Sequence, residues 1–493
     1  MELKVKFLGF SAGRPVAILN RKTAEVLSVY VNERVRIRNK HSIVAIVDIT
    51  EKIVNENEVA LSKEIIDILK IKEGSSIKVT TEPQPITTMY ISEKLEGKEL
   101  DDKKMKMIIG DIVHNTLTEV EVAFFVAGIY MHDMSYAETY NMIKAMVEFG
   151  KRLEISGEVY NKHCIGGIAG NRTTPIVIPI CSSLGLKIPK TSSRAITSAA
   201  GTADVIETLA NVEFPTEQIK KIINKTNGCM VWGGALGLAP ADDKIIQIER
   251  HLSLDPRSQL IASILAKKMA INSKGILIDI PFGKSAKVKT KKEALGLGKR
   301  FKKLANMLRL KLEFLITDGS QPIGNGIGPI LEMRDILKVL LQEEDRPIDL
   351  ENRAVLLAGK ILEMAGKAKK GEGMKIAYQE LKSGKAHKKF KEIIEAQGGN
   401  FTDLDIKLKK AKFSSDIISS KNGKIKEIDN KKISLIAKTA GCPADKSSGV
   451  YLYKHVGDKI RKGEKIITIY SGSSSELDYA KKAYEDTIPI FIS

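Results

Sequence analysis

A regular alternation of strand-like and helical segments begins at Gly157 and limits the possible folds more than any other pattern in the chain. Residues 158–161, 186–190 and 275–280 are short strand-like segments, and helical stretches separate them. Such an alternation is typical of βαβ units, in which parallel strands share one sheet and helices cover it. The sequence therefore predicts an α/β domain in the middle of the chain.

The chain has 493 residues, more than one hydrophobic core usually holds, so other domains are expected beside the predicted sheet. A small β-rich domain is expected before the breakers Pro83 and Pro85. Its predicted strands are residues 4–8, 25–31, 43–48 and 76–81. Towards the other end, the Lys-rich residues 375–415 show no clear core period, and short strands return after residue 433.

Between the β-rich segment and the predicted sheet, residues from about 90 to 155 are expected to be helical. Two pairs with capping-box spacing precede apolar-periodic runs in this stretch. The pairs are Thr118 with Glu121 and Ser135 with Glu138. We therefore predict a helical domain here.

The composition argues against several classes of protein. Four widely spaced cysteines with no CxxC pair argue against a disulfide scaffold and a zinc site built on such pairs, and favour a reducing cytoplasm. The chain has no run of about 18 uncharged apolar residues, so no membrane span is predicted, and no secretory leader pattern is recognised. A net charge of +19 favours an anionic partner, but aromatic residues at 5% are few for stacking on single-stranded nucleic acid.

Three turns rich in Gly, Ser and Thr fall inside the α/β region, at residues 162–170, 191–204 and 317–329. The first precedes a helix with Thr174 as predicted N-cap and Pro175 at its first position, where backbone amides and the helix N-terminus suit an anion. The spacing of its glycines is neither the dinucleotide-binding nor the P-loop pattern. From the residues alone, a phosphate site and a glycine-rich turn without a ligand both remain open.

The motifs in these turns resemble the signature of thymidine and pyrimidine-nucleoside phosphorylases. They follow that family's order, and the resemblance covers residues 88–493. The matching motifs are Lys162-His163 with Gly166-Gly167, Ser192-Ser193-Arg194-Ala195-Ile196, Ala200-Gly201-Thr202-Ala203-Asp204, Ala262-Ser263-Ile264-Leu265 with Lys267-Lys268, and Thr317-Asp318 with Gln321-Pro322. The first 84 residues and the turn at 323–329 are similar to one branch of this family, the archaeal AMP phosphorylases.

The resemblance implies an enzyme, a pentosyltransferase that cleaves nucleoside 5′-monophosphates with inorganic phosphate. AMP is the expected substrate, with CMP and UMP also used in that group, and the products are free base and ribose 1,5-bisphosphate, which feeds an archaeal Rubisco. Two alternatives stay open. One is a thymidine or pyrimidine-nucleoside phosphorylase, and the other is a non-catalytic RNA-binding protein on the same scaffold.

Pattern and resemblance together predict a multidomain α/β and α+β chain with a substrate cleft. The expected domains are an N-terminal β-rich domain at 1–84, a helical domain at 85–155 and 235–272, an α/β phosphate-binding domain at 156–234 and 273–345, and a C-terminal α+β region at 346–493. The resemblance also implies a homodimer, with the N-terminal domain able to extend the assembly. Nucleic acid and membrane are not expected partners.

The resemblance assigns two sets of binding residues. Inorganic phosphate is expected at Lys162, Thr173, Ser192 and Thr202, because a lysine cation and hydroxyl donors suit a phosphate dianion. The positions expected to bind AMP are Gly167, Ser193, Arg194, Ala195, Ile196, Thr197, Ser198, Thr202, Ser263 and Lys287, with Lys267 on the side of the base. Lys287 is the candidate for the 5′-phosphate, although a solvated helix face also explains a lysine in so basic a run.

The resemblance assigns proton donation to the base to Asp255. A carboxylic acid serves in this way only if burial raises its pKa towards the working pH. Without the resemblance, a helix cap before Pro256 is an alternative explanation of Asp255. His163 matches an acid/base histidine of the family, or it orients its loop. Cys164 stands where the family usually has serine, and a thiol is the weaker donor.

No metal or organic cofactor is expected, since inorganic phosphate is a co-substrate. The neighbouring carboxylates of Asp242 and Asp243 are interpreted as a charge pair at a helix start, with chelation as the alternative.

Overall fold

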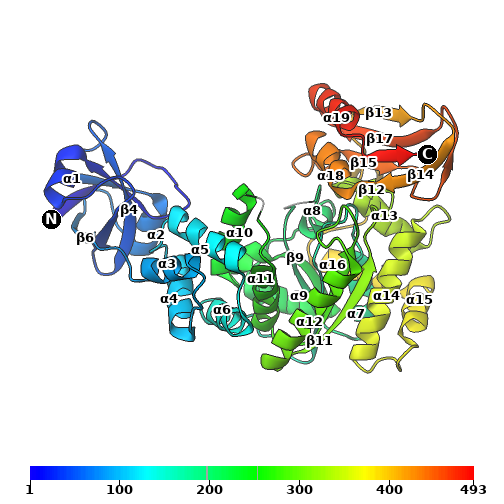
Figure 1. Cartoon of the computed structure of the whole chain (residues 1–493), viewed down its shortest axis with the longest axis horizontal. Coiled ribbons are helices and arrows are strands. Elements are labelled where there is room, and N and C mark those ends of the chain that lie inside the picture. Colours follow the sequence, from blue (N-terminus) through cyan, green and yellow to red (C-terminus); the bar gives the residue numbers. More distant parts are fainter. Residues whose placement is uncertain (196–197, 253, 403) are drawn as a thin grey trace. The chain divides into compact units, whose positions relative to one another are not determined.

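The computed structural model describes residues 1–195, 198–252, 254–402 and 404–493 (Figure 1). The chain divides into two compact units. The first contains Met1–Gly150 and Ala239–Ser263, and the second contains Lys151–Leu238 and Ile264–Ser493. Within the described residues, none of the helices combines the length and the apolar character that crossing a bilayer requires.

The first unit begins with six strands that close into a barrel in the order β1-β5-β2-β4-β3-β6. They are β1 (Glu2–Lys6), β2 (Val16–Asn20), β3 (Arg34–Arg38), β4 (Ser42–Thr50), β5 (Glu58–Leu61) and β6 (Ser76–Glu82). Alternate residues point inward, so Leu3 and Val5 on β1 and Val35 and Ile37 on β3 are buried. Two short helices, α1 (Arg21–Leu27) and α2 (Lys63–Leu69), pack against this barrel core.

The predicted strand at residues 25–31 is wrong, because helix α1 occupies the start of its span and the rest is not a strand. The side chain of Asn20 accepts a hydrogen bond from Lys22 N at 3.0 Å and caps the start of α1. This local cap starts a helix before the apolar residues that suggested a strand.

The same unit continues with a helical bundle, as the sequence predicted. Its helices are α3 (Thr87–Leu95), α4 (Asp102–Val113), α5 (Glu119–His132), α6 (Tyr136–Glu148) and α10 (Pro240–Leu252). Both predicted capping boxes are confirmed, at the starts of α5 and α6. The barrel contacts the bundle through Arg34, which is 4% exposed, donates to Thr116 O at 2.7 Å and pairs with Glu121.

The second unit contains the predicted parallel sheet. Three strands pair in parallel in the order β11-β10-β7, and two more form a parallel β8-β9 pair. The strands are β7 (Val159–Cys164), β8 (Ile188–Ser192), β9 (Gly228–Trp232), β10 (Ser273–Phe282) and β11 (Lys311–Asp318). A parallel bridge between Val159 and Lys187 sets β8 beside β7.

Helices cover this sheet and complete its core. They are α7 (Thr174–Ser183), α8 (Thr202–Ile206), α9 (Thr216–Thr226), α11 (Arg257–Ala270, which begins in the first unit), α12 (Lys291–Met307), α13 (Pro329–Leu341), α14 (Ile348–Met364), α15 (Gly373–Lys382) and α16 (Lys385–Ala396), with the short η1 (Gly233–Leu236) and α17 (Leu404–Lys407). The sequence showed no core-facing periodicity in residues 375–415, and this interpretation is wrong. Leu381, Phe390 and Ile393 are buried in one core with residues of α7. Lysines on the outer faces of α15 and α16 hid this period.

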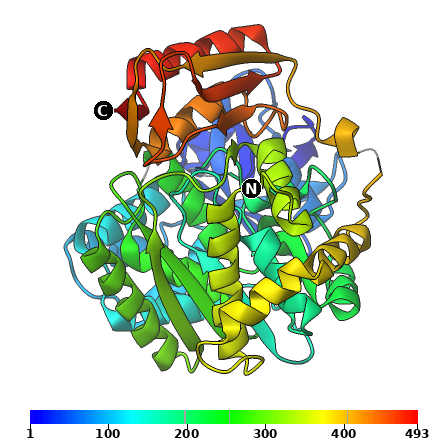
Figure 2. The same cartoon turned by 90° about the vertical axis from the view of Figure 1, so that its right-hand side faces the viewer.

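The last part of the second unit is a layer of strands and two helices, drawn in orange and red in Figure 2, beside the green and yellow α/β part. One sheet has the order β12-β15-β17-β13 and another β16-β14-β18. The elements are β12 (Gly326–Ile327), β13 (Phe413–Ile418), β14 (Gly423–Ile428), α18 (Asn430–Thr439), β15 (Gly449–Leu452), β16 (Lys459–Ile460), β17 (Lys465–Ser471), α19 (Ser474–Thr487) and β18 (Ile490–Ile492).

Candidate active site

Lys162 lies on β7 with its amine at the start of helix α7. The side chain is only 3% exposed, and Nζ donates to Thr173 Oγ1 at 2.8 Å and to Thr174 Oγ1 at 3.4 Å. Helix α7 begins at Thr174, so the cap is Thr173, one residue before the predicted one. A buried cation, two hydroxyls and the N-terminus of a ten-residue helix therefore meet at one point, an arrangement suited to an oxyanion.

Two further lysines are buried in the same region, and neither is among the residues predicted from the sequence to bind phosphate. Lys268 on α11 is 2% exposed, and its Nζ donates to Asn161 Oδ1 at 3.2 Å. Burial, with a smaller contribution from Lys267, lowers the pKa of Lys268 to about 8. Lys190 on β8 is 8% exposed, and burial together with the amines of Lys268 and Lys162 lowers its pKa well below the usual range. No local pattern distinguished Lys190 from the other lysines of this basic chain.

His163 and Cys164 follow Lys162 on the same strand. Burial and the positive charges of Lys190, Lys268 and Lys162 hold the pKa of His163 well below its usual value, so its imidazole is neutral near pH 7. Burial, followed by the nearby Asp279, raises the pKa of the Cys164 thiol to about 12. A thiol with so high a pKa is neither a thiolate nucleophile nor a strong donor.

The hydroxyl-rich loop after β8 is held together by Asp204. One carboxylate oxygen, Oδ2, accepts from Ala195 N and from Gly201 N, both at 2.7 Å. A Cβ on Gly201 would collide with the backbone carbonyl of Ser193, so the loop folds tightly back on itself. The hydroxyl of Ser192 donates to Val231 O at 3.1 Å, and Thr202 begins α8.

Other predicted AMP positions lie along this loop. The hydroxyl of Ser198 donates to Ala200 O at 2.6 Å, and Ser193 is exposed. Ile196 and Thr197, also predicted to bind AMP, lie outside the described residues.

Arg194 connects this loop to acidic side chains. Its guanidinium donates to both carboxylate oxygens of Glu207 at 2.9 Å and to Glu213 Oε1 at 2.9 Å, and it stacks on Trp232. These partners raise the pKa of Arg194, and the guanidinium lowers the pKa of Glu207 to about 2. The side chain therefore shapes the loop through its acidic partners.

Gly167 and Lys287 are brought together although they are far apart in the sequence. Gly167 has φ +87°, and a Cβ there would lie 2.6 Å from Lys287 N. Only glycine permits both this conformation and this close approach.

Asn430, at the start of α18, holds the two loops that carry Gly167 and Lys287. The side chain, 1% exposed, accepts from Ala169 N at 3.1 Å and donates to Ser285 Oγ at 3.0 Å and Gly319 O at 3.1 Å. The C-terminal layer thus reaches the loops of the predicted site, and no local pattern pointed to Asn430.

Two predicted site residues belong to the first unit. Asp255 is exposed in the segment between α10 and α11. Ser263 donates its hydroxyl to Asp242 Oδ2 at 2.7 Å, and Gln259 Nε2 donates to Asp242 Oδ1 at 3.2 Å. The buried Asp242 thus acts as an acceptor for two side chains of α11 from the first turn of α10.

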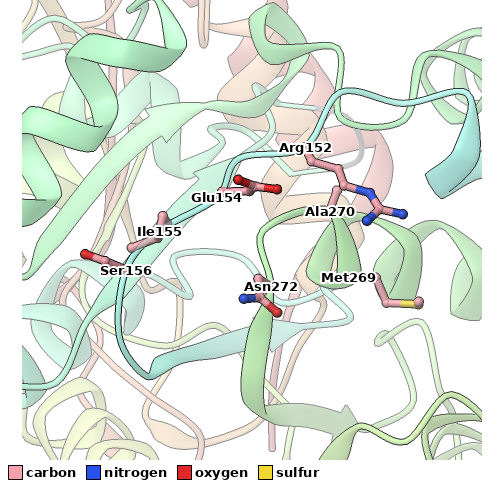
Figure 3. A pocket seen from close by; sticks show the side chains of 7 residues that line it. All are labelled: Arg152, Glu154, Ile155, Ser156, Met269, Ala270 and Asn272. Atoms are coloured by element: carbon pink, nitrogen blue, oxygen red, sulfur yellow. The ribbon is translucent and has the colours of Figure 1, made fainter.

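A pocket of about 530 Å³ opens elsewhere on the second unit, between residues 152–156 and 269–272 (Figure 3). It is lined by none of the predicted site residues, so it is separate from the lysine cluster. Among the described residues, no group of three or more His, Cys, Asp or Glu side chains is placed to hold a metal ion.

Comparison with known proteins defines the class first. Residues 88–150 match the helical bundle domain of a glycosyl transferase family, and residues 157–387 match its a/b domain. Residues 424–491 match the pyrimidine nucleoside phosphorylase C-terminal domain. Anthranilate phosphoribosyltransferase from Thermus thermophilus shares the fold, with a TM-score of 0.53 and 16% identity over 63% of this chain and 99% of that chain.

Relatives that match nearly the whole chain identify the family within this class. A provisionally named thymidine phosphorylase of Legionella pneumophila (strain Corby) is 43% identical over 99% of this chain and 95% of its own length. The AMP phosphorylase of Methanocaldococcus jannaschii is 41% identical over 99% of this chain and 97% of its own. The chain belongs to the thymidine and pyrimidine-nucleoside phosphorylase family, which confirms the resemblance seen in its motifs.

Proposed function

We propose that this enzyme cleaves nucleoside 5′-monophosphates, AMP above all and also CMP and UMP, with inorganic phosphate. A phosphate oxygen bonds to C1′ of the ribose while the bond from C1′ to the base nitrogen breaks. The bonding pair leaves with the base, which takes up a proton, and the products are free base and ribose 1,5-bisphosphate. The AMP phosphorylases that are 39–41% identical to this chain support this choice.

The observation that carries the proposal is the buried cationic site at Lys162. Its amine and the hydroxyl of Thr173 are already in hydrogen-bond contact at the N-terminus of α7. Ser192, the last residue of β8, and Thr202, the first residue of α8, complete the proposed phosphate ligands. A dianion bound there is the nucleophile, and the surrounding amines offset its charge.

The nucleotide is proposed to bind along the Ser193–Ser198 loop, with Gly167, Thr202, Ser263 and Lys287 as further contacts. Lys287 is the proposed partner of the 5′-phosphate, because its backbone packs directly on the Gly167 turn. Lys267 is proposed to support the base. This 5′-phosphate contact is what distinguishes the reaction from that of a nucleoside phosphorylase.

Asp255 is the proposed proton donor to the base. Its side chain is exposed in the segment between α10 and α11, where a bound base could reach it. His163, which is neutral for the reasons given above, is proposed to act as a hydrogen-bonding group rather than as an imidazolium acid. No cofactor is required by this chemistry.

We also propose a cytoplasmic homodimer with the four predicted domains. Exposed apolar side chains on α5, among them Val120, Phe124 and Met131, support a contact between two copies. Sedimentation equilibrium tests this assembly.

The function is tested by phosphate-dependent base release from AMP, CMP, UMP, adenosine and thymidine, measured side by side. Release from the monophosphates alone is expected. Release from thymidine alone would instead establish the thymidine phosphorylase, which the 43% identical Legionella relative favours. If none of the five compounds releases base and the protein retains RNA in a salt-sensitive way, the chain is instead a non-catalytic RNA-binding protein.

A further inference from the structure

Lys190 on β8 and Lys162 on β7 belong to neighbouring strands of the second unit. The bridge between Val159 and Lys187 is parallel, and Tyr160 N donates to Lys187 O at 2.9 Å. Lys162 and Lys190 each lie three residues after this bridge along their strands, and the charge of Lys162 acts on Lys190. Opposite residues in a parallel pair point to the same face, so both amines point towards the same side of the sheet.

The buried cations near this point differ in their partners. Lys162 donates to two threonine hydroxyls, Lys268 to Asn161, and Arg172 pairs with Glu332 and donates to Ala200 O. Lys190 is 8% exposed, and among the described residues its amine makes neither a hydrogen bond nor an ion pair. A buried amine among other amines is costly unless an anion joins it.

We propose that Lys190 is a second lysine ligand of the inorganic phosphate, placed so that the dianion binds between Lys162 and Lys190. The ligand is a tetrahedral oxyanion of two negative charges, which neutralises two adjacent amines. This inference rests on the proposed function only in taking inorganic phosphate as the nucleophile. Burial and the neighbouring amines lower the pKa of Lys190 well below its usual value. This direction agrees with the proposal, because a buried cation without a counter-ion is destabilised.

The phosphate group could come from two sources, inorganic phosphate or the 5′-phosphate of the nucleotide. Lys190 adjoins Lys162 and Ser192, whereas the Gly167 turn packs on Lys287, so inorganic phosphate is the source that the geometry favours. The two sources are separated by testing each one alone.

The test compares wild type with Lys190→Met and Lys190→Arg, and uses Lys187→Met as the matched control. Lys187 precedes β8, and its amine donates to Ser156 O and Asn224 Oδ1 on the surface. The melting temperature is measured without ligand, with inorganic phosphate alone and with AMP alone, and KM is measured for both substrates.

We expect Lys190→Met to melt no lower than wild type without ligand, because it removes a buried amine that has no acceptor among the residues described. The variant is expected to lose most of the stabilisation by inorganic phosphate, to keep that by AMP, and to raise KM for phosphate at least about tenfold. Lys190→Arg restores part of the phosphate effect, and Lys187→Met behaves as wild type.

Three results would overturn the proposal. The first is a Lys190→Met protein that melts lower without ligand and responds normally to phosphate, which makes Lys190 structural. The second is loss of the AMP effect alone, which assigns Lys190 to the nucleotide. The third is a wild type that phosphate does not stabilise. If no substrate releases base, yet phosphate stabilises wild type and not Lys190→Met, the proposed function fails and the phosphate ligand stands.

Discussion

The residues proposed for substrate binding have different surroundings in the two compact units. In the second unit, Lys162, Thr173 and Lys190 are buried, and the amine of Lys162 donates to the hydroxyls of Thr173 and Thr174. In the first unit, Asp255 is exposed, and the hydroxyl of Ser263 is donated to Asp242. The residues proposed for phosphate are therefore held in place by a core of their own unit, whereas the acid proposed for the base lies on the surface of its unit.

Removing the central cation of the residues proposed for phosphate should have the largest effect. Lys162→Met is expected to lower kcat/KM for phosphate at least about a hundredfold, because a charge-assisted donor inside a buried site is lost. Initial rates of base release at varied phosphate measure this effect. The exposed Lys151→Met is the control, and a fall of less than about threefold in Lys162→Met would remove Lys162 from the site.

A substitution of the proposed acid should change turnover rather than binding. Asp255→Asn is expected to keep the Kd for AMP and to lower kcat at least about tenfold, because the amide cannot give a proton to the leaving base. Isothermal titration and single-turnover rates separate the two quantities. Asp243→Asn, on the first turn of α10, is the matched control, and unchanged turnover in Asp255→Asn would reject the proton donor.

Asn430 tests whether the contacts of the C-terminal layer with the site loops affect substrate binding. Asn430→Ala is expected to raise KM for AMP about tenfold and to change kcat little, because it loses its contacts to Ala169, Ser285 and Gly319. Asn430→Asp keeps the acceptor for Ala169 N but cannot donate to Gly319 O, so it should lie between Ala and wild type. If Asn430→Ala and Asn430→Asp lose activity to the same extent even at saturating AMP, the loss comes from a folding defect instead.

The smallest effect is expected on protein stability when the ion pair between Arg194 and Glu207 is removed, and this effect depends on pH. Because the pKa of Glu207 is lowered from 4.5 to about 2, its contribution to stability is present above pH 4.5 and is lost as the pH falls towards 2. Since the pair is partly exposed, Glu207→Gln should cost less than about 1 kcal/mol at neutral pH. Melting temperatures of the two proteins should converge in acid, and a constant difference would contradict the ion pair.

Structural features that depend only on neighbouring residues were predicted well from the sequence. The capping boxes of α5 and α6 need only residues three positions apart, and both are present. The strand predicted at 25–31 failed where a competing local signal, the cap at Asn20, had been overlooked. The buried faces of α15 and α16 were missed because lysines on the outer faces obscured the apolar positions.

Non-local contacts lay outside the reach of any sequence pattern. The hydrogen bond from Ala169 to Asn430 joins residues 261 positions apart. Lys190 is one lysine in a strongly basic chain until the register between β7 and β8 sets it beside Lys162. Only then does its burial distinguish it from a solvated lysine.

The sequence by itself determined the family, the helical and α/β regions, and the motifs at Lys162 and along the loop after Ser192, because each of these is a pattern of nearby residue types. The tertiary structure decided which cations are buried, which of them have acceptors, and which distant side chain ties the loops together. Burial and charge interactions depend on everything that surrounds a group, and most of what surrounds Lys190 and Asn430 comes from distant parts of the chain.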